Sequence, residues 1–354
     1  MAILNGRTGI LALIIVGSTA SSLSAAPPAS RENKFQKDTL IGKIELYDPH
    51  AAAFISADAS IEVIAKGYKW SEGPVWVAGG QYLLFSDVPE NVVLKWQQGK
   101  DAGRYLTPSG YTSNTPRKGE IGSNGLSLDR KGRLILCQSG NRTVSRMLTA
   151  TDAPAPDYIV LAETYNGKRF NSPNDLVADS KNNIWFTDPI YGLPDGEKDS
   201  SRDLSFEGVY KISADDNSTT LVIDSIRRPN GIALSLDEKV LYVGSSDDRH
   251  PKWYAYNLDK DGKITGGRVL LDATALKKAA TVHQGPDGMK IDKYGNIFGA
   301  GPDGINIISP AGKRLGLIRV FGRPTSNCAF NETKDILYIT AGDLVLKVVL
   351  HPNG

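Results

Sequence analysis

Short apolar runs of strand type alternate with polar turns along most of the chain, and they recur in a fixed register. Each unit begins with a polar residue, here called its anchor, and an apolar residue in a strand-type run follows eleven positions later. The six anchors, spaced 52, 50, 56, 57 and 40 residues apart, are Glu72, Asn124, Asn174, Asn230, Asp287 and Asn327. The corresponding apolar residues are Leu83, Ile135, Trp185, Leu241, Phe298 and Tyr338. Six multi-strand units of this length predict the blades of a β-propeller.

Polar turns and one early strand complete the predicted architecture. Turns such as residues 129–133 (DRKGR) separate the first two strands of most units, and 36 Gly and 19 Pro supply turn-forming residues. The strand-type run at residues 61–64 precedes the first anchor, so we expect it to complete the last blade and leave no open sheet edge. The sequence therefore predicts an all-β, six-bladed β-propeller domain over residues 40–354.

The N-terminus has the layout of a secretory signal. Arg7 precedes an apolar run at residues 9–16, and small residues ending in Ser24, Ala25 and Ala26 follow. This run is much shorter than the ~20 residues of a membrane-spanning helix. We expect residues 1–25 to be a cleaved signal peptide, residues 26–39 to be a polar lead-in, and the mature protein to be periplasmic or secreted without stable membrane insertion.

Composition narrows the class of protein. The 354 residues include 41 Lys and Arg against 39 Asp and Glu, and 40% are hydrophobic. These values exclude a disordered chain, a membrane bundle and a strongly basic nucleic-acid binder, and they do not predict an oligomeric state. Cys137 and Cys328 lie in apolar segments. We expect buried free thiols, with a disulfide as the alternative.

The anchors are candidate metal ligands, because the entrance to the first strand of each blade faces the central channel of a propeller. Every anchor carries a carboxylate or amide oxygen. An isolated Asn-Gly or Asp-Gly is ordinarily a turn, but Glu72 has no turn preference and shares the register. Glu72 and Asp287 would repel each other at one buried site without a cation. A divalent metal ion is therefore expected on the axis.

The donor types favour calcium as that ion. Oxygen donors from Asp, Glu and Asn suit Ca²⁺, with Mg²⁺ and Mn²⁺ as alternatives. Zn²⁺ fits less well because it normally takes His or Cys ligands, and no anchor is of either type. Among the histidines, His283 is close enough in sequence to Asp287 to lie near the site, and a loop histidine without a role is the alternative.

Five segments together resemble one known family. They are residues 71–76 (SEGPVW), 171–175 (NSPND), 186–192 (FTDPIYG), 228–231 (RPNG) and 285–289 (GPDGM). This set resembles the SMP-30/gluconolactonase/LRE-like family, and most closely its bacterial gluconolactonase branch. Members of that family are six-bladed propellers with an axial metal, and the resemblance extends from about residue 61 to the C-terminus.

The resemblance implies roles for individual positions. It makes three anchors direct metal ligands: Glu72, Asn230 and Asp287. Asn174 matches a position that binds the metal in some members and mainly contacts substrate in others. Asn124 and Asn327 occupy equivalent blade positions, for which the resemblance does not establish ligation; Asn124 is expected to contact substrate.

The second blade departs from the pattern of many bacterial relatives, which carry Cys-x-His-Gly-x-Arg. Residues 137–142 read CQSGNR, so the His is absent and Arg142 is retained as an expected substrate contact. The long segment of residues 107–121, with Tyr111 as a further expected substrate contact, is a candidate lid. Residues 193–206 are a second candidate rim loop, and solvated surface loops are the alternative for both.

The predicted function is hydrolysis of a sugar lactone, with D-glucono-1,5-lactone converted to D-gluconate. A metal-bound carbonyl would stabilise the oxyanion, and Asp287 would act as general base toward water. No Ser-His-Asp signature is present, so a covalent acyl intermediate is not expected. The alternatives are a metal-dependent phosphotriesterase and a non-catalytic propeller that acts as a binding module.

Overall fold

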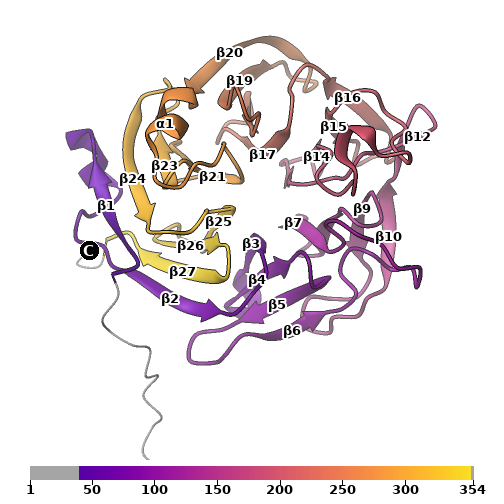
Figure 1. Cartoon of the computed structure of the whole chain (residues 1–354), viewed down its shortest axis with the longest axis horizontal. Coiled ribbons are helices and arrows are strands. Elements are labelled where there is room, and N and C mark those ends of the chain that lie inside the picture. The colour runs from indigo at the N-terminus through magenta and orange to yellow at the C-terminus, as the bar shows by residue number, and fades with distance from the viewer. Residues whose placement is uncertain (1–39, 352–354) are drawn as a thin grey trace, which may run out of the picture. The chain divides into compact units, whose positions relative to one another are not determined.

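The computed structural model describes residues 40–351, which form six antiparallel sheets of four or five strands around a common axis (Figure 1). The predicted all-β, six-bladed propeller is confirmed. The predicted signal peptide and polar lead-in, residues 1–39, lie outside the described residues, as do residues 352–354. Within residues 40–351 no helix is long and apolar enough to cross a membrane.

Each of the first four blades consists of four consecutive strands. Blade 1 contains β3 (Ser71–Val77), β4 (Tyr82–Asp87), β5 (Val92–Trp96) and β6 (Gly103–Leu106). Blade 2 contains β7 (Ser123–Leu128), β8 (Leu134–Gln138), β9 (Thr143–Met147) and β10 (Tyr158–Ala162). Blade 3 contains β13 (Leu176–Ala178), β14 (Ile184–Asp188), β15 (Gly208–Ile212) and β16 (Thr219–Ile223). Blade 4 contains β17 (Pro229–Leu234), β18 (Val240–Ser245), β19 (Lys252–Leu258) and β20 (Ile264–Asp272).

The last two blades recruit strands from the N-terminal side of the domain. Blade 5 contains β21 (Met289–Ile291), β22 (Ile297–Gly301), β23 (Gly304–Ile308), β24 (Arg314–Val320) and, at its outer edge, β1 (Gly42–Leu46). Blade 6 contains β25 (Asn327–Phe330), β26 (Ile336–Ala341), β27 (Leu344–Val349) and β2 (Ile61–Lys66). The indigo strand β2 therefore runs beside the yellow strand β27 (Figure 1), with Ile61 opposite Val348. The predicted ring closure by residues 61–64 is confirmed.

Few described elements lie outside the blades. They are the hairpin of β11 (Thr164–Tyr165) and β12 (Lys168–Arg169), the helix α1 (Thr274–Ala279), and three 3₁₀ turns at Pro49–Ala53, Ala78–Gly80 and Gly196–Lys198. The helix α1 follows the outermost strand of blade 4 and precedes the inner strand of blade 5. It therefore lies in the connection that leads to the anchor Asp287.

The eleven-residue register has a packing reason. The apolar residue of each unit lies in the second strand of its blade and is at most 2% exposed. Where the ring closes, Trp76 of blade 1 stacks on Tyr338 of blade 6, with ring centroids 5.1 Å apart. Since neighbouring side chains of a strand point to opposite faces, one register places these residues between adjacent sheets in every unit. Cys137 and Cys328 are buried free thiols, as predicted.

The polar turns between the first two strands share one device. Asp129, in the β7–β8 turn, accepts hydrogen bonds at Oδ1 from the backbone N–H groups of Lys131 and Arg133, both at 2.9 Å. Asp179 and Asp292 repeat this arrangement in the β13–β14 and β21–β22 turns, and Asp259 repeats it in the β19–β20 turn between the last two strands of blade 4. Each Asp satisfies backbone donors that the tight turn would otherwise leave unpaired.

The anchors lie where the inner strands are irregular and crowded. In blades 1, 2 and 4 a β-bulge interrupts the pairing of the first two strands at the anchor. A Cβ added at Gly73 would lie 2.0 Å from the carbonyl oxygen of Asn124, and one at Gly231 would lie 2.2 Å from that of Asp287. The glycine after the anchor therefore lets neighbouring inner strands approach closely enough to bring the anchors together.

Candidate functional site

Five of the six anchors line one cavity of about 270 Å³ at the end of the ring axis. They come from the entrances of five different blades and are Glu72, Asn124, Asn174, Asn230 and Asp287. Glu72 and the three asparagines are at most 5% exposed, and Asp287 is partly buried. The structure therefore brings together residues that are up to 215 positions apart in the sequence.

The amide oxygens of the three asparagine anchors in this cavity have no hydrogen-bond donor in the described part of the chain. Oδ1 of Asn124, of Asn174 and of Asn230 is buried and unpaired in each case. A buried acceptor without a partner is costly, and three in one cavity are not expected by chance. These oxygens are therefore available to a bound group.

The two carboxylates each keep one oxygen available as well. Glu72 Oε2 accepts hydrogen bonds from the backbone N–H of Gly73 at 2.6 Å and from Nδ2 of Asn327 at 3.4 Å. Asp287 Oδ1 accepts from the backbone N–H of Gly288 at 3.0 Å. The second oxygen of each carboxylate makes no such bond among the described residues, so the protein holds one side of the group and leaves the other side open.

The charged forms of both carboxylates are disfavoured in the protein without a bound cation. Burial, with a contribution from nearby Asp175, raises the pKa of Glu72 to about 8. Burial and repulsion by Glu72 raise the pKa of Asp287 well above its usual range. A divalent cation between them would reverse both effects, because it favours the charged form.

The donor set fits a hard divalent cation. Two carboxylates and three amide oxygens are ligands of the kind that Ca²⁺ takes. Across residues 40–351 there is no group of three or more His, Cys, Asp or Glu side chains placed to hold a metal, as expected when most donors are asparagine amides. The three unpaired amide oxygens are the structural observation that supports a divalent cation at this site.

Asn327, the sixth anchor, forms hydrogen bonds to neighbouring side chains through both atoms of its amide group. Asn327 donates from Nδ2 to Asp175 Oδ2 at 3.3 Å and to Glu72 Oε2, and its Oδ1 accepts from Lys290 Nζ at 3.1 Å. Lys290 Nζ also lies 3.8 Å from Asp175 Oδ2. Asn327 therefore directs its amide nitrogen, not its oxygen, toward the carboxylates and is not placed as a metal ligand.

Asp175 and Lys290 were not predicted as site residues, although the register of the repeats contains a signal for both. Asp175 occupies the position after the anchor, where four other units have glycine. Lys290 is the only charged residue three positions after an anchor. We call Asp175, Asn327 and Lys290 the axial triad; it lies next to the cavity, where Asn327 contacts Glu72.

Glu120 is another cavity residue without a predicted role. It comes from the segment of residues 107–121, which the sequence suggested as a lid, and Asn124 Nδ2 donates to its Oε2 at 3.5 Å. Burial raises the pKa of Glu120 to about 6. Arg117 of the same segment donates to the carbonyl oxygens of Gly140 and Gly192, which fastens the segment to blades 2 and 3.

Charged and aromatic side chains complete the cavity wall. Arg228, Lys277, Tyr191 and Trp70 line it, and so does His283, whose Nδ1 lies 2.8 Å from the carbonyl oxygen of Lys277. The expectation that His283 could lie near the site is therefore met. Among residues 193–206, the second candidate rim loop, none lines the cavity.

Two expected substrate contacts lie elsewhere. Arg142 is 2% exposed, and it donates from Nε to Phe170 O at 2.6 Å and from Nη1 to Ser201 O at 2.7 Å. Tyr111 is held by its backbone, which exchanges hydrogen bonds with the Asn91 side chain. Neither residue lines the cavity, so the geometry gives their predicted substrate contacts no support.

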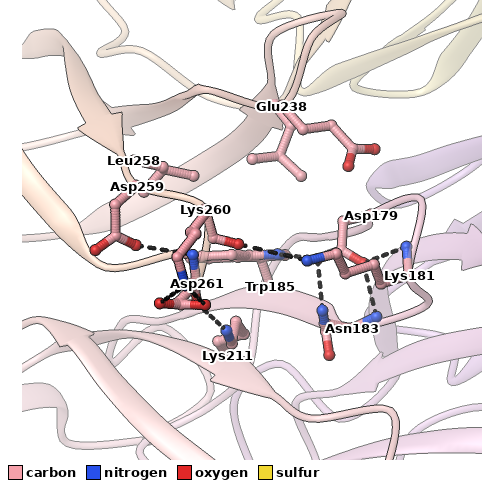
Figure 2. Close-up of a pocket in the computed structure, with 12 residues that line it drawn as sticks. Asp179, Lys181, Asn183, Trp185, Lys211, Glu238, Leu258, Asp259, Lys260 and Asp261 are labelled. Atoms are coloured by element: carbon pink, nitrogen blue, oxygen red, sulfur yellow. Dashed lines mark hydrogen bonds and ion pairs between the residues drawn. The ribbon is translucent and has the colours of Figure 1, made fainter.

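A second hollow, between the turns of blades 3 and 4, differs from the axial cavity (Figure 2). It measures about 90 Å³, and its polar groups are paired with one another. Asp179 Oδ2 accepts from Asn183 Nδ2 at 2.8 Å and from Trp185 Nε1 at 3.2 Å, and Lys211 Nζ donates to Asp261 O at 2.9 Å. Because these groups already have partners, this hollow is not the candidate site.

The fold and the axial cavity define a class of protein: a six-bladed β-propeller whose inner strands present carboxylate and amide oxygens to one buried site. A family model described as the SMP-30/Gluconolactonase/LRE-like region matches residues 70–343. The chain belongs to this family, so the resemblance found in the sequence motifs is confirmed.

Individual relatives agree with this assignment. A gluconolactonase of Zymomonas mobilis is 37% identical over 337 residues, which cover 94% of this chain and 93% of the relative. A solved gluconolactonase structure from Xanthomonas campestris has a TM-score of 0.74 at 27% identity and covers 87% of this chain and 94% of its own. The calcium-binding regucalcin of Agrobacterium tumefaciens, with a TM-score of 0.63 at 16% identity over 82% of this chain and 94% of its own, shares the fold.

Proposed function

We propose that the protein hydrolyses sugar lactones, with D-glucono-1,5-lactone as the first substrate to test and D-gluconate as its product. The observation that carries the proposal is the convergence of five anchors with available oxygens in one cavity. The Zymomonas mobilis relative, named a gluconolactonase and matched over nearly its whole length, supports this substrate class.

We infer that Glu72, Asn174, Asn230 and Asp287 hold a divalent cation, with Ca²⁺ preferred for their oxygen donors. When bound, such a cation supplies Lewis-acid polarisation of a substrate carbonyl and stabilises negative charge on its oxygen. Glu72 fits the role of a fixed ligand, since the donors from Gly73 and Asn327 orient its carboxylate.

We assign the proton-accepting role to Asp287. The backbone N–H of Gly288 holds Oδ1, so Oδ2 is the oxygen that can take a proton from water as its oxygen forms a bond with the lactone carbonyl carbon. The ring C–O bond then breaks, and the departing oxygen takes up the proton held by Asp287 to become the hydroxyl group of the open-chain acid, which leaves Asp287 ready for the next cycle. Because a lactone ring opens readily, one positioned base and charge stabilisation at the carbonyl suffice chemically.

The test is an assay of the purified protein on D-glucono-1,5-lactone, in which acid release is followed above the uncatalysed rate. We expect hydrolysis with Ca²⁺ present and a loss of at least tenfold after stringent chelation, restored when Ca²⁺ is added back. Full activity after chelation would refute the metal requirement. A phosphotriester cleaved with a higher kcat/KM than any lactone would identify the phosphotriesterase alternative, and absence of any hydrolysis would favour a binding module.

The reaction is proposed to occur in the periplasm or outside the cell. Arg7, the apolar run at residues 9–16 and the small residues before Ala26 support this placement. Cell fractionation with an antibody against the propeller domain would test it, and recovery of the protein in the cytosolic fraction would contradict it.

A further inference from the structure

Glu120 is a cavity carboxylate that no cation of the protein neutralises. It lines the same cavity as the anchors, and within residues 40–351 it takes part in no ion pair. Its one hydrogen bond is the 3.5 Å contact from Asn124 Nδ2. A carboxylate can accept about four hydrogen bonds, so most of its accepting capacity is free.

The position of Glu120 differs from that of a metal ligand. It comes from the segment before blade 2 and not from an inner strand, so it is outside the register that brings the anchors to the axis. It holds the amide nitrogen of Asn124, whereas the unpaired oxygen of Asn124 is the atom left for a bound group. Glu120 therefore lies on the nitrogen side of Asn124.

The cationic side chains of the cavity wall are already engaged. Arg228 Nη1 donates to Glu207 Oε1 at 2.8 Å, and Lys277 Nζ lies 3.5 Å from Asp248 Oδ1. Neither is paired with Glu120. The wall thus combines engaged cationic donors with one carboxylate that still needs donors, and the hydroxyl groups of a sugar are neutral donors of the right kind.

We propose that Glu120 is a specificity-determining residue that accepts hydrogen bonds from hydroxyl groups of the substrate ring. The assignment rests on the proposed lactone hydrolysis and names the chemical class of its substrate: a polyhydroxylated ring, as opposed to an aliphatic lactone. A site built to bind a hydroxyl group discriminates strongly against a substrate that lacks it, because its buried acceptor is then left unpaired.

The experiment compares D-glucono-1,5-lactone with δ-valerolactone, which has the same ring without hydroxyl groups. We expect Glu120→Ala to lower the ratio of the two kcat/KM values by about 10- to 150-fold, the range for a hydrogen bond to a charged group. Glu163→Ala, which removes an exposed carboxylate outside the cavity, is the matched control and should leave the ratio unchanged. Glu120→Gln, which keeps an acceptor oxygen, should lie between wild type and Glu120→Ala.

Two binding measurements separate this proposal from others. Methyl β-D-glucopyranoside has a hydroxylated six-membered ring but no lactone, and calorimetry should show at least fivefold weaker binding to Glu120→Ala than to wild type. Calcium affinity should fall less in Glu120→Ala than in Glu72→Gln; an equal fall would make Glu120 a metal ligand and overturn the proposal.

The outcomes also distinguish failure of this proposal from failure of the proposed function. If wild type hydrolyses neither lactone but binds the glucoside in a Glu120-dependent way, the lactonase proposal fails and hydroxyl recognition stands. An unchanged selectivity ratio, or wild type that neither prefers the sugar lactone nor binds the glucoside, would overturn the role of Glu120.

Discussion

The cavity and the axial triad next to it are built from the same repeat but satisfy their charges in opposite ways. In the triad, Lys290 approaches Asp175 and Asn327, so a cation of the chain itself balances the buried carboxylate. In the cavity, which also holds three unpaired amide oxygens, no lysine or arginine within residues 40–351 pairs with Glu72 or Asp287, because Arg228 and Lys277 in its wall are engaged with Glu207 and Asp248. The same repeat can thus give a closed structural network or an open ligand site, and the difference is whether the chain supplies the cation.

Asn327 marks the boundary between the two regions. Its amide nitrogen contacts Glu72 on the cavity side and Asp175 in the triad, while its oxygen accepts from Lys290. An asparagine in this orientation compensates carboxylates instead of ligating a metal. Substitutions on the two sides of Asn327 should therefore have effects of different kind and, for stability, of different sign.

The largest effect is expected from Asp287→Asn in the cavity. Loss of the general base should lower kcat on D-glucono-1,5-lactone by about 10²- to 10⁴-fold, while circular dichroism and thermal unfolding show a folded propeller. Asp58→Asn, which makes the same change at an exposed position, is the control and should retain wild-type activity. Wild-type kcat in Asp287→Asn would rule out a proton-accepting role for this carboxylate.

A substitution in the triad should instead lower stability. Lys290→Met leaves Asp175, which is 1% exposed, without its cation, so the free energy of unfolding should fall by about 2 kcal/mol with or without Ca²⁺. The double variant Lys290→Met/Asp175→Asn removes the unpaired charge and should recover part of the loss. Urea unfolding measures both, and an unchanged midpoint in Lys290→Met would show that the lysine does not balance Asp175.

Glu72→Gln tests the cavity, where, unlike in the triad, loss of a charged side chain should not lower the stability of the metal-free protein. Loss of one of two carboxylate ligands should weaken calcium binding about tenfold or more in calorimetry. In the metal-free protein the same change removes repulsion with Asp287, so its unfolding midpoint should not fall below that of metal-free wild type. A drop in metal-free stability like that of Lys290→Met would mean that the two regions do not differ as described.

The features of the fold and of the site that recur in every blade could be predicted from the sequence. The strand-turn-strand register is local, and propeller topology then requires that anchors up to 215 positions apart meet. The pairing of Asp175 with Lys290 was not predicted because it depends on how two inner strands face each other across the axis. Glu120 was missed because its segment belongs to no repeat.

Motifs alone were least informative about side-chain direction. The second-blade motif predicts a substrate contact for Arg142, yet its guanidinium donates to Phe170 and Ser201. A sequence pattern fixes the backbone position of such a residue, whereas the direction of a long side chain depends on which carbonyl oxygens the neighbouring loops present. The meeting of five anchors in one cavity, in contrast, depends mainly on backbone position and was predicted from the sequence.

The smallest effect, a pH dependence of stability, follows from the same contrast. In the metal-free protein the folded state raises the pKa of Glu72 from its usual 4.5 to about 8. Between these values the folded state binds the proton more tightly than the unfolded state, so metal-free stability falls as pH rises from about 4.5 to 8 and then levels off. With Ca²⁺ bound the carboxylate is held in its charged form, and this fall should be absent. Scanning calorimetry should show a decrease in Tm over this range for metal-free wild type and a flatter profile for Glu72→Gln. Parallel profiles for the metal-free and calcium-loaded proteins would mean that the cation does not bind at Glu72.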